Sequence, residues 1–166
     1  FTAQEAWPLI PEQSEKYVFT ADWYDLPQAS TTNLVSADHW QTLISVKTAV
    51  NKQIEAARNT KLVGSNLSAQ VDLWANDTLY PVLDQLGNEL RFVLITSQVN
   101  LHALDENQGE ATDVAGLRVQ ISPAAGSKCA RCWHVLPDVG SHVEHSTICG
   151  RCIINVAGQG EERQYA

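Results

Sequence analysis

The sequence predicts an α+β fold in three successive parts: a helical segment in residues 1–60, a small α/β junction with a linker in residues 61–127, and a cysteine-bound module in residues 128–166. Three observations support this prediction: helical periodicity in the first part, alternating apolar residues in the second, and four clustered cysteines in the third. The apolar share of 44% is enough for a core and shows no bias toward disorder.

From Ser36 to about residue 60, apolar residues recur every three or four positions, as on the buried face of a helix. Ser36 is placed to cap this helix, and Gly64 is expected to end it. The basic residues Lys47, Lys52 and Arg58 form either a solvated face or an RNA-facing one. The periodic apolar residues are Trp40, Leu43, Ile44, Val50, Ile54 and Ala57.

The first ten residues read as the last turns of a helix that ends before Pro11. Their apolar side chains, which are Phe1, Trp7, Leu9 and Ile10, need a partner that the rest of the sequence does not clearly supply. The chain also starts at Phe1 and contains no methionine. We therefore expect it to be the excised or processed end of a longer polypeptide.

The middle of the chain predicts three strands and one short helix. Apolar and polar residues alternate over residues 69–74 and again through Leu117, Val119 and Ile121, as strands require. Residues 92–101 are rich in Val, Ile and Thr and form the third expected strand, and residues 76–86 suit a short helix. Residues 105–116 are expected to be the main loop, and residues 122–127 the main linker.

The net charge of −8 is unevenly distributed along the chain. Residues 1–127 carry 7 Lys and Arg against 15 Asp and Glu, whereas residues 128–166 carry 4 of each. Nucleic-acid affinity depends largely on basic side chains that displace counterions, so any such contact must be local. No membrane-spanning run or secretory signal is visible, which predicts a soluble, cytoplasmic protein with no membrane partner.

The four cysteines form two CxxC pairs separated by sixteen residues: Cys129 with Cys132, and Cys149 with Cys152. A tight turn between the members of each pair lets four thiolates surround one Zn²⁺ ion. The alternatives are two disulfides or four free thiols, and a reducing compartment disfavours the disulfides. Because four thiolates fill the tetrahedral shell, the predicted zinc is structural and leaves no position for water or substrate.

Other residues of this segment could take part in metal or nucleic-acid binding. Three histidines between the cysteine pairs could compete as ligands, and they are His134, His142 and His145. Trp133 either packs as the small core of the module or is presented for stacking on a base. Ser122, Ser127 and His134 show no spacing that supports catalysis, and no phosphate-binding glycine loop or nucleophile–base motif is found.

The run from Lys128, which reads KCARCWH, and the later runs ICGRC and NVAGQGEERQYA resemble the carboxyl-terminal zinc module of bacterial isoleucyl-tRNA synthetases. The resemblance continues upstream through FTAQEAW (1–7), KYVFTADWY (16–24), VNKQIEAAR (50–58), KLVG (61–64) and ELRFVLITS (89–97). It implies the end of a helical anticodon-binding bundle, then a small α/β junction, then a zinc knuckle. One departure is Ser65-Asn66-Leu67-Ser68-Ala69, where the family usually has Gly-Ser-Leu-Glu-Ala.

The resemblance also implies a function and a set of site residues. Cys129, Cys132, Cys149 and Cys152 would bind zinc, and Trp133 would stack on a base of the anticodon loop of isoleucine tRNA. The residues that would contact phosphate are Arg131, Arg151 and Arg163. ATP and Mg²⁺ would bind only in the catalytic domain, which would lie upstream with the editing domain, because neither the HIGH nor the KMSKS signature is present.

Two alternatives remain open on the residues alone. A similar four-cysteine finger closes DNA glycosylases of the formamidopyrimidine type, but the upstream runs favour the synthetase, so no DNA partner is expected. The finger could also be a purely structural clamp that ties the tail to another part of the parent enzyme without contacting RNA.

Overall fold

The computed structural model describes residues 1–12, 14–26 and 35–165. Contacts divide the chain into two compact units, Phe1–Asn33 and Leu34–Ala166. The division predicted at residues 60 and 127 remains a prediction about domains. In the structure, the long helix that begins the second unit packs on the sheet that comes after it.

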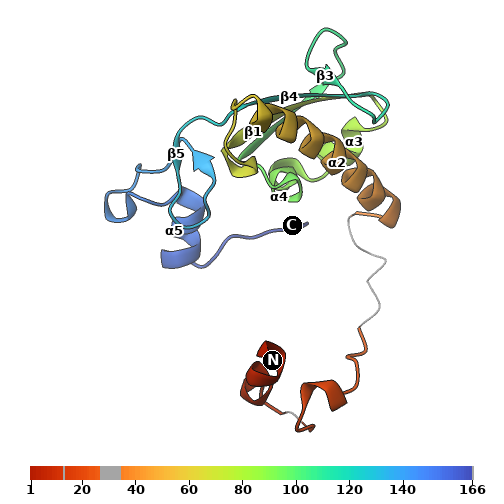
Figure 1. Ribbon diagram of the computed structural model, residues 1–166. Helices are drawn as coiled ribbons and strands as arrows, with labels where there is room; N and C mark the ends of the chain where they lie inside the picture. Colours follow the sequence, from red (N-terminus) through yellow and green to blue (C-terminus); the bar gives the residue numbers. More distant parts are fainter. Residues whose placement is uncertain (13, 27–34, 166) are drawn as a thin grey trace. The chain divides into compact units, whose positions relative to one another are not determined.

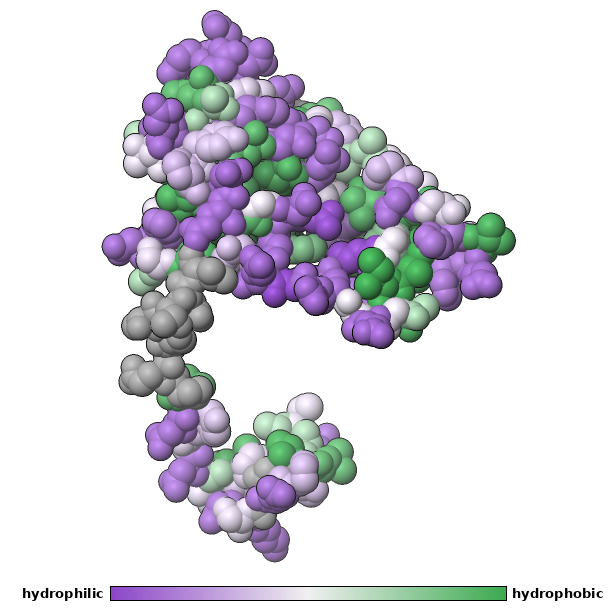
Figure 2. Space-filling model, turned by 180° about the vertical axis from the view of Figure 1, so that it is seen from behind, coloured by the Kyte–Doolittle hydropathy of each residue, from purple (hydrophilic) through white to green (hydrophobic). Residues whose placement is uncertain are grey.

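The first unit consists of short helical turns: α1 (Thr2–Ala6), η1 (Trp7–Leu9) and η2 (Val18–Thr20). The Gln4 side chain accepts a hydrogen bond from the Val18 N–H at 2.9 Å, which ties these turns together. Large apolar side chains stay exposed, as the green groups on this unit show (Figure 2). They include Phe1, Leu9, Phe19, Trp23 and Leu26.

The second unit begins with α2 (Ala37–Asn59), and the Ser36 hydroxyl caps it by accepting from the His39 N–H at 3.2 Å. The expected end at Gly64 is wrong. Lys61 adopts the left-handed conformation at φ 61°, and Leu62 N–H bonds to the Ala57 carbonyl at 2.9 Å, which makes a Schellman ending. Even α2 is not apolar enough to cross a membrane, nor is any other helix in the described residues.

A four-stranded sheet in the order β2-β1-β4-β3 lies against α2 (Figure 1). Its strands are β1 (Ala69–Ala75), β2 (Gln98–Ala103), β3 (Glu110–Ala111) and β4 (Leu117–Pro123). β1 runs parallel to β2 and antiparallel to β4. On β1, Val71 and Leu73 are buried in the core shared with α2, whereas Asp72 between them is only partly covered.

The segment between β1 and β2 differs from the prediction. The expected helix over residues 76–86 is reduced to the single turn α3 (Tyr80–Asp84). The expected strand over residues 92–101 starts only at Gln98, because its first residues belong to α4 (Leu90–Leu94), which follows η4 (Gly87–Glu89). A parallel β1–β2 pair needs such a crossover, and the helical turns supply it.

The last part is a small module that leaves the sheet after β4. It contains the hairpin β5 (Ser127–Lys128) and β6 (Val135–Leu136), then η5 (Val143–His145) and α5 (Gly150–Ala157). Gly126 enters the hairpin at φ 109°, and a Cβ there would lie 2.2 Å from the Leu136 carbonyl oxygen, so only glycine fits. The predicted α+β class with a terminal four-cysteine cluster is confirmed.

Candidate metal centre

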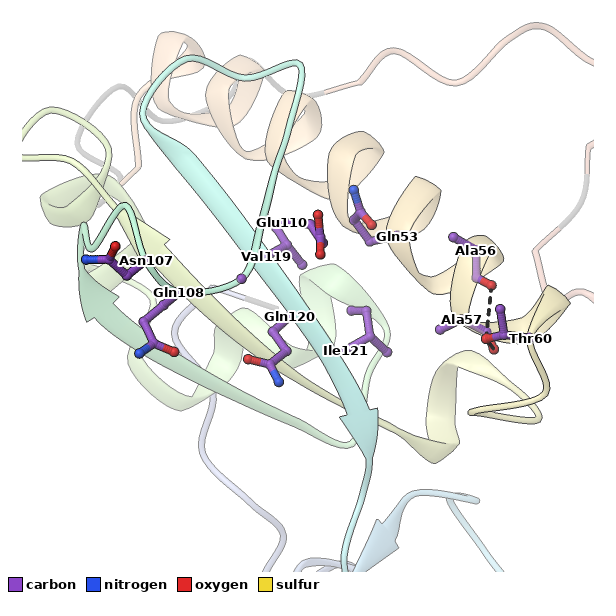
Figure 3. Close-up of a pocket in the computed structure, with 11 residues that line it drawn as sticks. Gln53, Ala56, Ala57, Thr60, Asn107, Gln108, Glu110, Val119, Gln120 and Ile121 are labelled. Atoms are coloured by element: carbon purple, nitrogen blue, oxygen red, sulfur yellow. Dashed lines mark hydrogen bonds between the residues drawn. The ribbon is translucent and has the colours of Figure 1, made fainter.

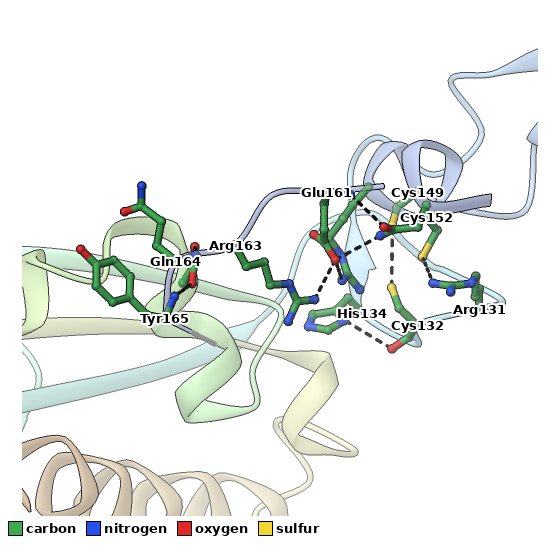
Figure 4. Close-up of polar contacts among 12 residues, drawn as sticks. Arg131, Cys132, His134, Cys149, Cys152, Glu161, Arg163, Gln164 and Tyr165 are labelled. Carbon is green, nitrogen blue, oxygen red and sulfur yellow. Dashed lines mark hydrogen bonds and ion pairs between the residues drawn. The ribbon is translucent and has the colours of Figure 1, made fainter. Parts of the chain in front are cut away.

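The four cysteine sulfurs come together at one point, all within 4.8 Å of one another. Figure 4 labels three of these residues, Cys132, Cys149 and Cys152. The Sγ atoms of Cys129 and Cys152 are 3.7 Å apart, as are those of Cys132 and Cys149. A ZnS₄ tetrahedron with Zn–S bonds of about 2.3 Å has edges of about 3.8 Å, whereas a disulfide requires about 2.05 Å. The donor set fits zinc, and all four cysteines are free thiols.

Two local structures hold the cysteine sulfurs in position. In the first, the Trp133 N–H bonds to the Cys129 carbonyl at 3.0 Å and the Cys129 N–H bonds to the His134 carbonyl at 2.9 Å, which closes a tight turn around the first pair. In the second, Cys149 is the N-cap of α5 and Cys152 lies in its first turn. Cys129, Cys149 and Cys152 are fully buried.

The thiols differ in their tendency to ionise. Burial disfavours the Cys129 thiolate, but hydrogen bonds from the backbone N–H groups of Cys132 and Cys149 outweigh it and lower its pKa to about 6. Burial raises the pKa of Cys149 to about 12. Four thiolates cannot coexist in this space without a cation, and a zinc dication provides the charge that displaces the protons.

Two arginine side chains next to the sulfurs supply further positive charge. The Arg131 guanidinium donates to the Cys152 Sγ at 3.6 Å. Burial disfavours the charge on Arg151, yet its hydrogen bonds to the Cys132 sulfur and the Glu161 carboxylate raise its pKa. Two of the arginines expected to contact phosphate therefore lie beside the metal centre.

Histidine does not replace a cysteine in this centre. Among the described residues, the cluster that can hold a metal contains cysteines only. His134 is buried and its Nδ1 lies 3.3 Å from the Cys132 carbonyl oxygen. Burial and the positive charges of Arg151 and Arg91 lower the pKa of His134, so this imidazole is neutral at pH 7. The four cysteines form a structural zinc site with no open position.

Trp133 lies at the surface of the module, with 60% of the residue exposed, so it is not the module's core. The Lys128 ammonium lies 5.3 Å from the centre of its indole ring. Beside the ring is an open hollow of about 300 Å³, lined by Trp133, Lys128, Val135 and the segment from Ser65 to Ser68. The hollow therefore combines an aromatic face, a cation and hydroxyl and amide groups.

Arg151 and Arg163, the third expected phosphate contact, meet at the Glu161 carboxylate. Arg151 and Arg163 each place a guanidinium nitrogen 2.8 Å from the same Glu161 oxygen, and both also lie over the Phe92 ring. Lys128, Glu161 and Phe92 were missed by the sequence reasoning. Lys128 stands directly before Cys129 and could have been found from that position, but nothing local links Phe92 to the distant segments it joins.

Another hollow lies between α2 and the sheet (Figure 3). It has a volume of about 630 Å³ and is lined mainly by amide and apolar groups, among them Gln53, Gln108 and Gln120. Glu110 is its one carboxylate among the described lining residues. This lining offers neither a nucleophile with a base nor a cluster of metal ligands.

Comparison with known proteins bears on the choice between a ligase and a glycosylase. A family model described as the zinc finger found in FPG and IleRS matches residues 126–154. The chain is 72% identical over 166 residues to the isoleucine–tRNA ligase of Acinetobacter baylyi, 48% over 168 residues to that of Teredinibacter turnerae, and 47% over 171 residues to that of Haemophilus ducreyi. The chain is similar, along its whole length, to part of the bacterial isoleucine–tRNA ligases.

These three matches span the whole chain but only a small part of each ligase. Each covers 100% of the chain and 18% of the ligase. The finger description names two enzyme classes, so the finger alone does not separate a ligase from a glycosylase. The similarity to isoleucine–tRNA ligases through residues upstream of the finger does, and it confirms the resemblance inferred from the sequence.

Proposed function

We propose that this chain is the tRNA-facing part of an isoleucine–tRNA ligase, and that the hollow beside Trp133 receives an unstacked nucleotide of the anticodon loop. The observation that carries this proposal is an indole exposed on a zinc-held turn next to Lys128. Aromatic faces stack on bases of single-stranded loops, and a neighbouring ammonium attracts phosphate.

The surrounding surface supports a local contact rather than a broad one. Residues 1–127 are strongly acidic, whereas residues 128–166 are neutral, so the least repulsive surface for RNA is the zinc module. Arg131 is exposed and remains a candidate for phosphate contact. Arg151 and Arg163 remain candidates only if RNA competes with Glu161 for them.

The rest of the reaction belongs to the remainder of the ligase. ATP, Mg²⁺ and isoleucine would bind in catalytic and editing domains outside this chain, and the ligase would act in the cytoplasm. Residues 1–60 would end the anticodon-binding helical domain, and residues 61–127 would join it to the zinc module. A purely structural finger, with no RNA contact, is the competing hypothesis.

Trp133→Ala in the full-length ligase tests the proposal. Loss of one base–aromatic stack costs about 1 to 3 kcal/mol, so kcat/KM for tRNA charging should fall by roughly 5- to 150-fold. Trp133→Phe should retain most of the activity because it keeps an aromatic face. The matched control is Val143→Ala, which removes an exposed apolar side chain from the same module.

Zinc content must be one ion per chain in every variant, so that loss of the module is not mistaken for loss of stacking. Isoleucyl-adenylate formation without tRNA should be unchanged. Normal charging by a zinc-loaded Trp133→Ala ligase would exclude the stacking role and favour the structural finger.

A further inference from the structure

The chain reverses direction after α5 and returns toward the sheet. The N–H groups of Gly158 and Gly160 both bond to the Ile154 carbonyl, and Gly160 has φ 93°, which makes the turn. The Glu161 N–H then bonds to the Asn155 Oδ1 at 3.0 Å. The returning segment, residues 161–165, passes below α4 (Figure 1) and is called the strap.

At its first residue the strap is fixed to the zinc module. One oxygen of Glu161 accepts from Arg151 at 2.8 Å, from the Asn155 amide at 3.1 Å and from Arg163 at 2.8 Å (Figure 4). The side chains of Glu161 and Arg151 are only 21% and 16% exposed. Burial raises the pKa of Glu161, but these three hydrogen bonds outweigh it and lower the pKa, which keeps the carboxylate charged.

At its other end the strap is fixed to the α/β unit. The Glu89 carboxylate accepts from the backbone N–H groups of Gln164 at 2.8 Å and Tyr165 at 2.7 Å. The Tyr165 side chain packs against the core that α2 and the sheet share. The five-residue strap therefore joins α5 of the module to η4 next to α4.

Between the two ends of the strap, the Phe92 ring on α4 contacts three side chains. The Arg163 guanidinium lies 4.1 Å from its ring centre and that of Arg151 5.1 Å, while His134 meets the ring edge-on at 6.0 Å. Arginine on an aromatic face gains cation–π energy as well as packing. Two residues of the module and one of the strap thus converge on a single ring of the α/β unit.

Another joint involves the β5–β6 hairpin of the module. The Ser97 hydroxyl accepts from the Val135 N–H at 2.7 Å and donates to the Leu67 carbonyl at 2.5 Å, close to where β4 passes into β5. Without the strap, we expect the module to be able to rotate about this joint. The Trp133 hollow takes walls from both sides of the joint, because Ser65 to Ser68 belong to the α/β unit while Lys128 and Trp133 belong to the module.

We propose that the strap sets the orientation of the zinc module on the α/β unit, with Glu161 as its main positioning residue, and thereby fixes the shape of the Trp133 hollow. The strap acts without touching the hollow or the zinc. Arg151 and Arg163 serve this orientation through Glu161 and Phe92. The proposal rests on the proposed function in one respect: the fixed shape of the hollow matters because a nucleotide would bind there.

The test measures orientation directly, in the whole zinc-loaded chain labelled with ¹⁵N. Residual dipolar couplings report whether residues 35–123 and residues 127–157 share one alignment tensor. The variants are Glu161→Gln, which removes the charge that Arg151 and Arg163 share, and a chain ending at Gly160, which removes the strap. The matched control is Glu162→Gln, which changes the exposed neighbouring carboxylate.

The wild-type chain and Glu162→Gln should fit a single tensor. In Glu161→Gln and in the shortened chain, the tensor of the module should fall by about a third or more relative to that of the α/β unit, with one zinc ion retained. A shared tensor in both altered chains would overturn the proposal. So would loss of zinc from either chain, because the strap would then stabilise the metal site rather than orient it.

This result is independent of the stacking proposal. The couplings are measured without RNA, whereas the Trp133→Ala experiment measures tRNA charging in a ligase whose strap is intact. A fixed module with no charging defect in Trp133→Ala would reject only the nucleotide site. A charging defect with a shared tensor in both strap variants would reject only the strap.

Discussion

Trp133 shows how a metal turn determines what one residue does. Its backbone is left-handed, at φ 66°, at the end of the turn that its N–H closes by bonding to the Cys129 carbonyl. A bulky residue in this region costs roughly 1 kcal/mol or more, and glycine would avoid the cost. An exposed indole in a strained position contributes little to folding, which agrees with a role in binding.

Asp72 lies on the partly open face of β1 and gathers three donors. Its carboxylate accepts from Asn100 at 2.9 Å, His102 at 3.0 Å and Gln70 at 3.2 Å. Burial raises its pKa, but these hydrogen bonds outweigh it and hold the pKa below the ordinary value of 3.8. The carboxylate therefore stabilises the fold most when it is charged.

Asp72→Asn should lower the free energy of unfolding by about 1 to 2 kcal/mol at pH 7, because it removes the charge from these hydrogen bonds. A depressed pKa in the folded state gives stability that is present above the unfolded-state pKa and is lost as the pH falls through the folded-state pKa. The gap between wild type and variant should thus shrink below about pH 4. Urea unfolding at each pH measures it.

The control for this experiment is Asp77→Asn, which alters an exposed carboxylate beyond the end of the same strand. It should change stability by less than about 0.5 kcal/mol at every pH. A gap for Asp72→Asn that widened below about pH 4 would show that the hydrogen bonds favour the protonated form instead.

At the scale of single elements, α2 ends by backbone geometry rather than at the nearest glycine. Lys61 occupies the left-handed position that follows the C-cap, and the two returning hydrogen bonds satisfy the carbonyls of Ala57 and Arg58. Gly64 comes three residues later in an open position. The ending thus places an L-residue where glycine is usually preferred.

Lys61→Gly should raise the free energy of unfolding by about 1 kcal/mol, because it relieves the left-handed backbone of an exposed residue. Lys47→Gly makes the same chemical change inside α2 and should lower stability by about 1 kcal/mol. Chemical denaturation of both variants gives the two values. Equal destabilisation by both would mean that Lys61 makes contacts worth more than its backbone strain.

The sequence predicted the elements that have a local pattern of apolar residues or cysteines, and it missed those that do not. The helix α2, the strands β1 and β4 and the cysteine pairs carry short-range periodicity or spacing, and the structure confirms them. Of the apolar residues expected on the buried face of α2, Ile44 is instead 53% exposed. Residues 92–94 are apolar and suit a strand, but the crossover between two parallel strands makes them helical. The grouping of Phe92, Arg151 and Glu161 depends on tertiary packing, so no local pattern revealed it.

At the scale of the second unit, two kinds of core lie side by side. The larger is made of aliphatic side chains from α2, the sheet and the short helices, whereas the smaller consists of the cysteines with Leu136, Val139 and Ile148. A module of about 30 residues buries too little apolar surface to fold alone, so metal binding supplies its folding free energy. The strap and Ser97 then attach it to the larger core.

Removal of zinc should consequently unfold the module and leave the α/β core intact. After chelation, the amides of Trp133 and Ile153 should lose hydrogen-exchange protection, because they bond to the carbonyls of Cys129 and Cys149, whereas Leu73 and Leu94 should keep theirs. Returning zinc should restore protection in the module. Loss of protection at Leu73 as well would mean that the two cores fold as one cooperative unit. A module that stayed protected without metal would mean that packing against Phe92 and the strap is sufficient to keep it folded.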